Sequence, residues 1–145
     1  MAIIALLATL ILAALSGAQK GARDTRRKSD LNQYKTALAQ FNGTYLTYPD
    51  DGGSCIGSPN GISATTAPFG NAGQNLQTGG FLNQFIGAPQ AGGSGYQYYG
   101  YCYRTSGSDK EFTMWTRLER TGRFFCVGPT TSKEDAVQAN CLWPG

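Results

Sequence analysis

The chain opens on an uninterrupted apolar run that differs from the rest of the sequence. Residues 1–15 carry no charge, and Thr9 is their one polar side chain. As a helix the run would extend about 22 Å, short of the roughly 30 Å hydrocarbon core of a bilayer. It is apolar on every side, whereas a surface helix keeps a polar face. We therefore expect a membrane-spanning segment that about nine further apolar residues would complete at its N-terminal side. A secretory signal peptide cleaved near Ala18 is the alternative.

The pattern then changes from uniformly apolar to amphipathic without a break in helical character. No Pro or Gly occurs between residues 22 and 38, and apolar residues recur at steps of three and four. These residues share one helical face: Leu31, Tyr34, Leu38 and Phe41. Asn42-Gly43 is a helix stop signal. The sequence therefore predicts one N-terminal helix over residues 1–41.

Such a helix would be about 60 Å long, more than the remaining chain can cover. We expect residues 22–41 to pack on a globular head formed by residues 42–145. Residues 1–21 then form the membrane or filament-core part of the helix, and must be buried by other molecules. The side chains expected in that core are Ile3, Ile4, Leu6, Leu7, Leu10, Ile11, Leu12 and Leu15.

Two glycines stand at the polar edge of the apolar run. Gly17 and Gly21 have the spacing of a GxxxG motif, which can bring two membrane helices together. Each glycine also costs about 1 kcal/mol of helix propensity relative to alanine. Because both lie at the edge of the run and not at its centre, we interpret them as a weak point where the helix can bend or unwind.

The last third of the chain has the alternating pattern of β-strands. Between residues 111 and 118, Phe112, Met114 and Leu118 fall on one side and Trp115 on the other. Aromatic-rich stretches on either side, joined by short turns, extend this to an antiparallel meander over about residues 96–127. We expect the apolar face of the helix to cover the sheet. The predicted fold class is α+β, a long N-terminal α-helix packed on a C-terminal antiparallel β-sheet.

An uncharged loop of about residues 50–95 connects the helix to the sheet. No charged residue occurs between Gly52 and Tyr103. The pairs Phe81-Leu82 and Phe85-Ile86 are interpreted as one or two helical turns that pin this loop to the core. A surface without charge suits packing against identical copies, where like charges would repel.

Composition excludes some functions. With 41% hydrophobic and 12% aromatic residues, the chain can build a core and is not a disordered tail. Histidine is absent, which removes the commonest general base and metal ligand. Asp50-Asp51 has no third carboxylate nearby in sequence and is interpreted as a turn, not as a calcium site. We expect no enzyme, and hence no catalytic, cofactor-binding or metal-ligating residue and no cofactor.

The excess positive charge lies directly after the apolar run. The first 35 residues hold six basic and two acidic residues, and the remainder holds six basic and seven acidic ones. Four of the six basic residues in the first 35 positions form a basic block: Arg23, Arg26, Arg27 and Lys28. This block could bind nucleic acid or mark the cytoplasmic side of a membrane. We favour a third interpretation, in which it pairs with Asp24, Asp30 and acids on neighbouring subunits.

Several of these features occur together in one known family. The apolar run Ala2–Leu10, the block Arg23-Asp24-x-Arg26-Arg27-x-x-Asp30-Leu31, Ala37-Leu38 and Tyr48-Pro49 follow one another in order. In this, the first third of the chain resembles a bacterial type IV pilin. The resemblance implies the type IV pilin fold and a structural subunit that polymerises through its apolar helix. The product would be an extracellular filament, or fimbrium, used for adhesion, twitching motility or DNA uptake.

The resemblance also implies partners and a processing history. The partners would be further copies of the chain, the cytoplasmic membrane before assembly, the pilus assembly machinery and prepilin peptidase, with DNA less favoured. Pilins begin, after a removed leader, with a Phe-Thr-Leu-Ile-Glu-type segment that carries a methylated N-terminus and an assembly glutamate. The first acid here is Asp24, so neither feature transfers to any residue of this sequence. Two alternatives are a type II secretion pseudopilin and a secreted binding module behind a cleaved signal peptide.

Four cysteines remain: Cys55, Cys102, Cys126 and Cys141. None belongs to a C-x-x-C pair, and an even number in an exported domain favours disulfides over a metal site. Their spacing leaves three pairings open. The pilin resemblance implies a Cys126–Cys141 disulfide that bounds a C-terminal segment, which leaves Cys55 with Cys102.

Overall fold

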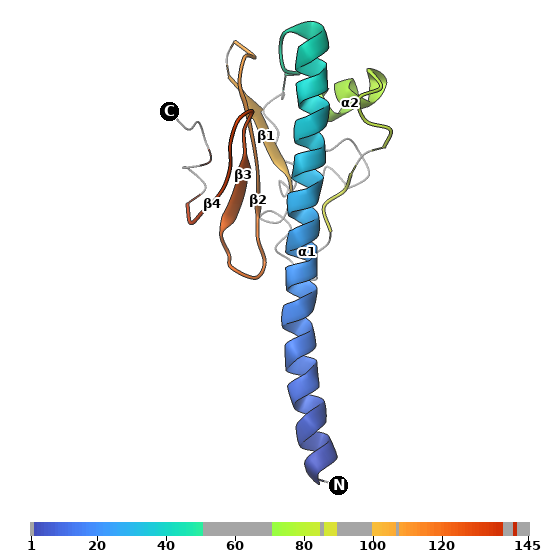
Figure 1. Ribbon diagram of the computed structural model, residues 1–145, viewed down its shortest axis with the longest axis vertical. Helices are drawn as coiled ribbons and strands as arrows, with labels where there is room; N and C mark the ends of the chain where they lie inside the picture. Colours follow the sequence, from blue (N-terminus) through green and yellow to red (C-terminus); the bar gives the residue numbers. More distant parts are fainter. Residues whose placement is uncertain are drawn as a thin grey trace.

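One long helix dominates the molecule. The computed structural model describes residues 2–50, 71–84, 86–89, 100–106, 108–137 and 141, with side chains in the first helix described from Leu15 onward. Helix α1 runs from Ala2 to Tyr45, 44 residues, and is therefore about 66 Å long. Its C-terminal half packs along the head, while its N-terminal half projects from the head (Figure 1). We call residues 2–21 the projecting segment. Within the described part of the chain, no helix has a stretch both long and apolar enough to cross a membrane.

The helix does not end where the sequence predicted. It passes through Gly43 as regular helix and ends at Tyr45, so the predicted end at residue 41 is wrong. The end is made by Leu46, whose positive φ of 58° takes the left-handed position that glycine usually fills. The Leu46 amide donates to the Asn42 carbonyl at 2.8 Å, which satisfies one of the last carbonyls of the helix. Gly43 weakens the helix there without terminating it.

A four-stranded antiparallel sheet forms the other half of the α+β arrangement. Its strands are β1 (Cys102–Thr105), β2 (Phe112–Arg117), β3 (Phe124–Val127) and β4 (Ser132–Asp135), in the order β1-β2-β3-β4. The register pairs Trp115 of β2 with Cys102 on one side and Cys126 on the other. Three of these strands fall within the predicted meander, while β4 was not predicted. Its exposed sequence Ser-Lys-Glu-Asp lacks the apolar alternation that marks a half-buried strand.

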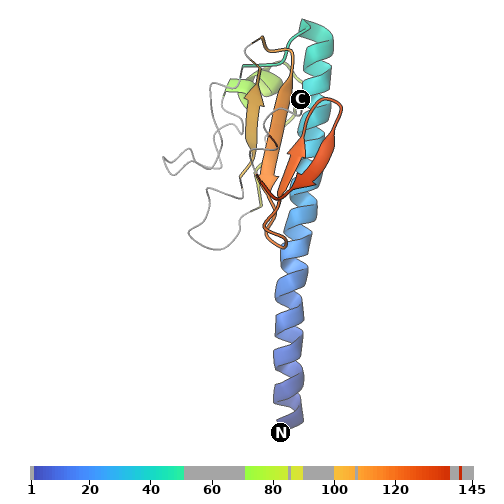
Figure 2. The same ribbon diagram turned by 90° about the vertical axis from the view of Figure 1, so that its left-hand side faces the viewer.

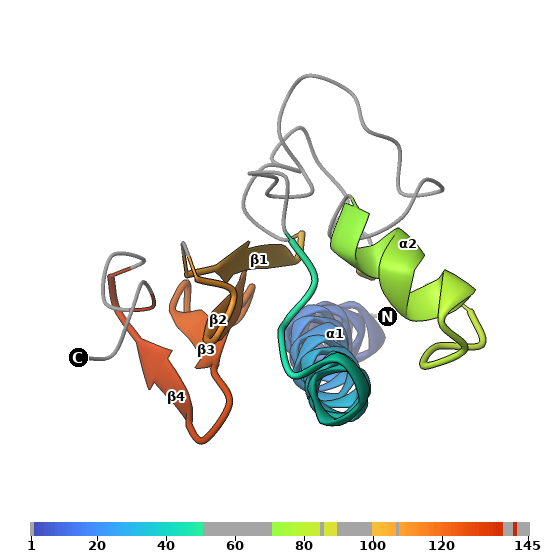
Figure 3. The same ribbon diagram turned by 90° about the horizontal axis from the view of Figure 1, so that it is seen from above.

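The main core lies between α1 and the sheet. Alternation along β2 turns Phe112 and Met114 toward α1, and Trp115 toward the opposite face. Seen along the helix axis, the sheet lies on one side of α1 and α2 on another (Figure 3). The helix α1 and the sheet both contribute fully buried side chains to this core, among them Leu31, Tyr34, Leu38, Met114 and Val127. Phe41 lies at the margin of the core, with its ring centroid 5.5 Å from that of Phe81.

The described part of the connecting loop contains a helix, but not at the predicted place. Helix α2 covers Asn71–Thr78 and buries Ala72 and Leu76 against the core. It ends at Gly79-Gly80, where Gly80 has a φ of 75°. Phe81 and Leu82 follow this stop outside any helix, which corrects the predicted helical turns. They are nevertheless partly buried against the main core, whereas Phe85 lies outside the described residues.

Candidate functional site: the junction of the projecting helix and the head

The base of the head is built around one carboxylate of α1. Asp24 lies where the projecting segment meets the sheet, close to the turn between β2 and β3, and is 6% exposed. Its two oxygens accept the backbone amides of Glu119, at 2.8 Å, and Arg120, at 2.9 Å. Figure 2 shows this turn at the end of the sheet nearest the projecting segment. Asp24 therefore fixes the height at which the head sits on the helix.

Arg27 is the most deeply buried charged residue of this junction. Its side chain has no exposed surface, and it donates to Asp24 Oδ1 at 3.0 Å and to the Pro89 carbonyl at 2.9 Å. Its Nη2 also lies 2.5 Å from Glu119 Oε1. A buried guanidinium is tolerable because several acceptors in a fixed geometry replace its lost hydration. Arg27 thus joins α1, the β2–β3 turn and the loop before β1.

Arg23 completes the set that we call the junction cluster: Arg23, Asp24, Arg27 and Glu119. The Arg23 Nε donates to both oxygens of Glu119, at 2.9 and 3.0 Å, and its Nη2 donates at 2.6 Å. Burial by itself would raise the pKa of the Glu119 carboxyl, but hydrogen bonds from Arg23 and Arg27 and their positive charges outweigh it, so this pKa is lowered. The hydrogen bond to Glu119 in turn raises the pKa of Arg23.

Two tyrosines link the helix to the head above this cluster. The Tyr101 hydroxyl donates to Asp30 Oδ2 at 2.5 Å, and the Tyr34 hydroxyl donates to the Ile86 carbonyl at 3.0 Å. Burial raises the pKa of both hydroxyls, and the hydrogen bond to Asp30 raises that of Tyr101 further. The two rings meet edge to face with centroids 6.3 Å apart. Both tyrosines therefore combine core packing with a satisfied polar end.

The outer strand β4 is tied to the helix by a more exposed ion pair. Lys28 Nζ lies 2.5 Å from Glu134 Oε1, and about a third of each side chain is exposed. The same ammonium group lies 5.6 Å from the centroid of the Phe125 ring. The Arg123 guanidinium donates to the Glu134 carbonyl at 3.3 Å. The helix thus contacts both the base and the edge of the sheet through charged side chains.

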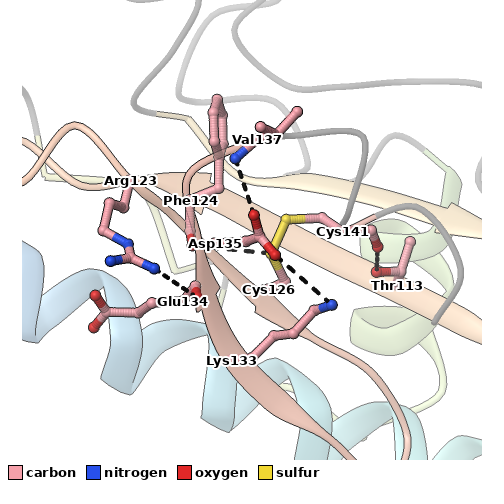
Figure 4. Close-up of a disulfide and its surroundings, with 9 residues drawn as sticks. All are labelled: Thr113, Arg123, Phe124, Cys126, Lys133, Glu134, Asp135, Val137 and Cys141. Carbon is pink, nitrogen blue, oxygen red and sulfur yellow. Dashed lines mark hydrogen bonds and ion pairs between the residues drawn. A yellow bond between two sulfur atoms is a disulfide. The ribbon is translucent and has the colours of Figure 1, made fainter.

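A disulfide holds Cys141 on the outer face of the sheet. Figure 4 shows Cys126 of β3 joined to Cys141. The Cys141 carbonyl accepts from the Thr113 hydroxyl at 2.6 Å. Together with Cys102 and Trp115, the two cysteines form a second buried cluster. Cys126–Cys141 is the pairing that the pilin resemblance implies, and Cys55, the partner expected for Cys102, lies outside the described residues.

The projecting segment leaves the head just below the junction cluster. From residue 15 to residue 20 every residue is exposed, and Leu15 is 51% exposed. The helix is continuous through Gly17 and Gly21, and a Cβ at either position would meet nothing within 4 Å. Their role as a weak point stays a prediction, as does the filament-core role of the apolar side chains before Leu15. Asp50 is exposed, while Asp51 lies outside the described residues.

The structure shows which acidic residues pair with the predicted basic block. The basic block pairs with acids of its own chain, because Arg26 lies 3.8 Å from Asp30 and Arg27 lies 3.0 Å from Asp24. Pairing with neighbouring subunits stays a prediction. The sequence missed Glu119 and Glu134 as partners, because both are far from the block in sequence. One signal was available: Glu119 lies in a short turn directly after a strongly patterned strand, where a carboxylate can reach back to a covering helix.

Comparison with protein-family models, with curated proteins and with solved structures finds no match to this chain.

Proposed function

We propose that this chain is the structural subunit of a type IV pilus and polymerises through its apolar N-terminal helix into an extracellular filament. The observation that carries the proposal is the projecting segment. Its helix continues about 30 Å beyond the head with a charge-free apolar sequence up to Ser16. A surface of that kind requires cover from lipid or from other copies of the chain.

The junction cluster supports this function mechanically. In a filament, force on the head must reach the helix without separating the two. Arg23 and Arg27 hold Glu119 of the β2–β3 turn, and Asp24 caps two amides of the same turn. The contact therefore consists of several hydrogen bonds between rigid elements, which resist shear better than apolar contacts alone.

The proposed cycle has two environments for the projecting segment. Before assembly it rests in the cytoplasmic membrane, and in the filament it is bundled with the same segment of other copies. Both surroundings are apolar, so transfer gains little from the hydrophobic effect, and close helix packing must hold the polymer. The proposal includes the type IV pilin fold, roles in adhesion or motility, and no enzymatic activity.

Electron microscopy of the purified full-length chain after slow removal of detergent tests the proposal. We expect filaments from the unaltered chain and none from Leu7→Asp, because a carboxylate cannot be buried in an apolar helix bundle without a partner. Gln33→Asp is the matched control, since it adds the same charge at an exposed position of the helix beside the head. Filaments from Leu7→Asp would refute the proposed axis.

N-terminal mass analysis of the exported protein separates the proposal from a secreted binding module. Cleavage near Ala18 would remove the apolar run and leave a soluble head, which contradicts a filament subunit. Retention of residues 2–15 is the outcome that the proposal requires.

A further inference from the structure

The base of the head carries an asymmetry of charge. Two of its acids are turned inward: the Asp24 and Glu119 side chains are 9% and 5% exposed and are occupied by the junction cluster. Two others, Glu134 and Asp135 of β4, are 35% and 22% exposed and lie beside Lys28 and Lys133. Four cations there are exposed instead, and we call them the basic collar: Lys20, Arg26, Arg120 and Arg123. Among the described residues, neither Lys20 nor the Arg120 side chain has an acidic partner, and Arg26 lies 3.8 Å from Asp30 with 63% of its side chain exposed.

The collar lies near the point where the helix leaves the head. Lys20 lies seven residues before Arg27, two helical turns, and therefore on the face of α1 that points beneath the head. The Arg120 backbone amide donates a hydrogen bond to Asp24, which is four residues, about one helical turn, after Lys20. Arg120 therefore lies about one turn above Lys20. Arg123 closes the same β2–β3 turn, which lies at the base of the sheet (Figure 2).

Lys20, the collar residue nearest the apolar run, lies above that run by about the thickness of a headgroup layer. Lys20 lies five residues beyond Leu15, about 7.5 Å along the axis, and Asp24 about 13.5 Å. The polar layer on each side of a bilayer is about 5–8 Å thick. With Leu15 at the edge of the hydrocarbon, Lys20 reaches the outer headgroups, and the long Arg26 and Arg120 side chains lie within about one Debye length of them.

We infer that the basic collar binds the anionic phospholipid headgroups of the membrane in which the projecting segment rests before assembly. The inference rests on the proposed function, since it needs that segment in a bilayer. Binding is electrostatic and carries no requirement for a particular headgroup beyond its negative charge. Its consequence is that the collar favours the membrane-bound subunit over the extracted one, so that lipid charge controls how readily a subunit enters the filament.

A vesicle-to-vesicle transfer experiment with the full-length chain tests this inference. The protein is reconstituted into phosphatidylcholine vesicles, mixed with vesicles of equal parts phosphatidylcholine and phosphatidylglycerol, and its distribution is measured after separation by flotation. We expect preference for the anionic vesicles, reduced about fivefold by each of Lys20→Gln and Arg120→Gln. The preference should shrink between about 0.1 and about 1 M salt.

Arg104→Gln is the matched control, because it removes the same charge from an exposed position on β1, away from the base. It should keep the preference of the unaltered chain. An equal distribution between the two vesicles, or an unchanged preference in Lys20→Gln and Arg120→Gln, overturns the inference.

The failure of the inference differs visibly from failure of the proposed function. A chain that forms filaments but shows no preference for anionic vesicles refutes the collar alone. A chain that cannot be reconstituted into vesicles and forms no filaments refutes both. If Lys20→Gln and Arg120→Gln abolish filaments while the vesicle preference is unchanged, the collar contacts a second copy of the chain, and the lipid inference is wrong.

Discussion

The guanidinium of Arg27 lies 2.5 Å from the carboxylate of Glu119, and the two side chains are 0% and 5% exposed. This contact joins the helix to the turn at the base of the sheet. The Pro89 carbonyl accepts a further hydrogen bond from Arg27, so one side chain connects three segments of the chain. Because both charges are out of water, each depends on the other, and the junction should fail when either is removed.

Replacing Arg27 by Met should therefore destabilise the head strongly. The substitution leaves Asp24 and Glu119 buried with one cation fewer, and we expect a loss of about 3 kcal/mol or more in the free energy of unfolding. Denaturant unfolding in a mild non-ionic detergent measures it. Arg26→Met is the matched control at the adjacent position: its side chain is 63% exposed, and its loss should stay within about 1 kcal/mol. Equal effects of the two substitutions would contradict the role given to Arg27.

Acid should weaken the same junction. The Glu119 pKa is lowered in the folded state, so the carboxylate contributes stability above its unfolded pKa of about 4.3 and loses it as pH falls through the folded value. The free energy of unfolding of the unaltered chain should thus fall as the pH drops below about 5 and through the lowered pKa of Glu119. Glu119→Gln should be less stable than the unaltered chain at neutral pH. The difference between their free energies of unfolding should narrow as the pH falls. Glu111→Gln removes an exposed carboxylate beside β2 and should show the same pH dependence of stability as the unaltered chain. If the stability difference between Glu119→Gln and the unaltered chain stays constant with pH, the charge of Glu119 is not the cause of that difference.

The local patterns of the sequence predicted the elements that local physics determines. The three-and-four spacing of Leu31, Tyr34 and Leu38 marked the face of α1 that is buried in the core. Alternation placed Phe112 and Met114 opposite Trp115, and the structure separates them onto the two faces of the sheet. Each pattern reflects the repeat of a single helix or strand, and the residues of that element alone are enough to reveal it.

What the sequence could not provide were contacts set by tertiary structure. Strand β4 has no apolar alternation and pairs with β3 through backbone hydrogen bonds that any residues can make. The junction depends on the contacts of Glu119 with Arg23 and Arg27. These contacts are set by the position of the sheet along the axis of α1. The helix end was misjudged because Asn42-Gly43 is a common stop signal, yet Leu46 takes the left-handed conformation instead.

The disulfide should be demonstrable without a structure. Trypsin cleaves after Arg123 and Lys133, so Cys126 and Cys141 fall in separate peptides that should travel together until reduced. Cys55 and Cys102 fall within one tryptic peptide, whose predicted internal disulfide would lower its mass by two hydrogens. A reducible link from Cys102 to either of the other two peptides would contradict both pairings. Replacing Cys126 and Cys141 together by Ala should cost about 3 kcal/mol for a sequence separation of 15 residues.

A buried hydroxyl on β2 offers a stabilising substitution. Thr116 is 1% exposed, and its Oγ1 has no hydrogen-bond partner among the described residues. Thr116→Val keeps the shape and the β-branching while removing a desolvated polar atom, and should raise the free energy of unfolding by about 1 kcal/mol. Thr113→Val is the control on the same strand, because the Thr113 hydroxyl donates to the Cys141 carbonyl at 2.6 Å. Thr113→Val should lower the free energy of unfolding. The two substitutions together test whether the hydrogen bonding of the hydroxyl decides if its removal stabilises or destabilises the chain.

Gly43 provides a direct test of where α1 ends. If the helix continues to Tyr45, Gly43 has helical dihedral angles, and a Cβ there would meet nothing within 4 Å. Gly43→Ala should then raise the free energy of unfolding by about 0.5–1 kcal/mol, because alanine has the higher helix propensity and restricts the unfolded chain. Gly80→Ala is the contrasting variant: its φ of 75° disfavours any side chain, so it should lower stability by about 1 kcal/mol even though the space around it is open. A destabilising Gly43→Ala would instead place the helix stop at Asn42-Gly43.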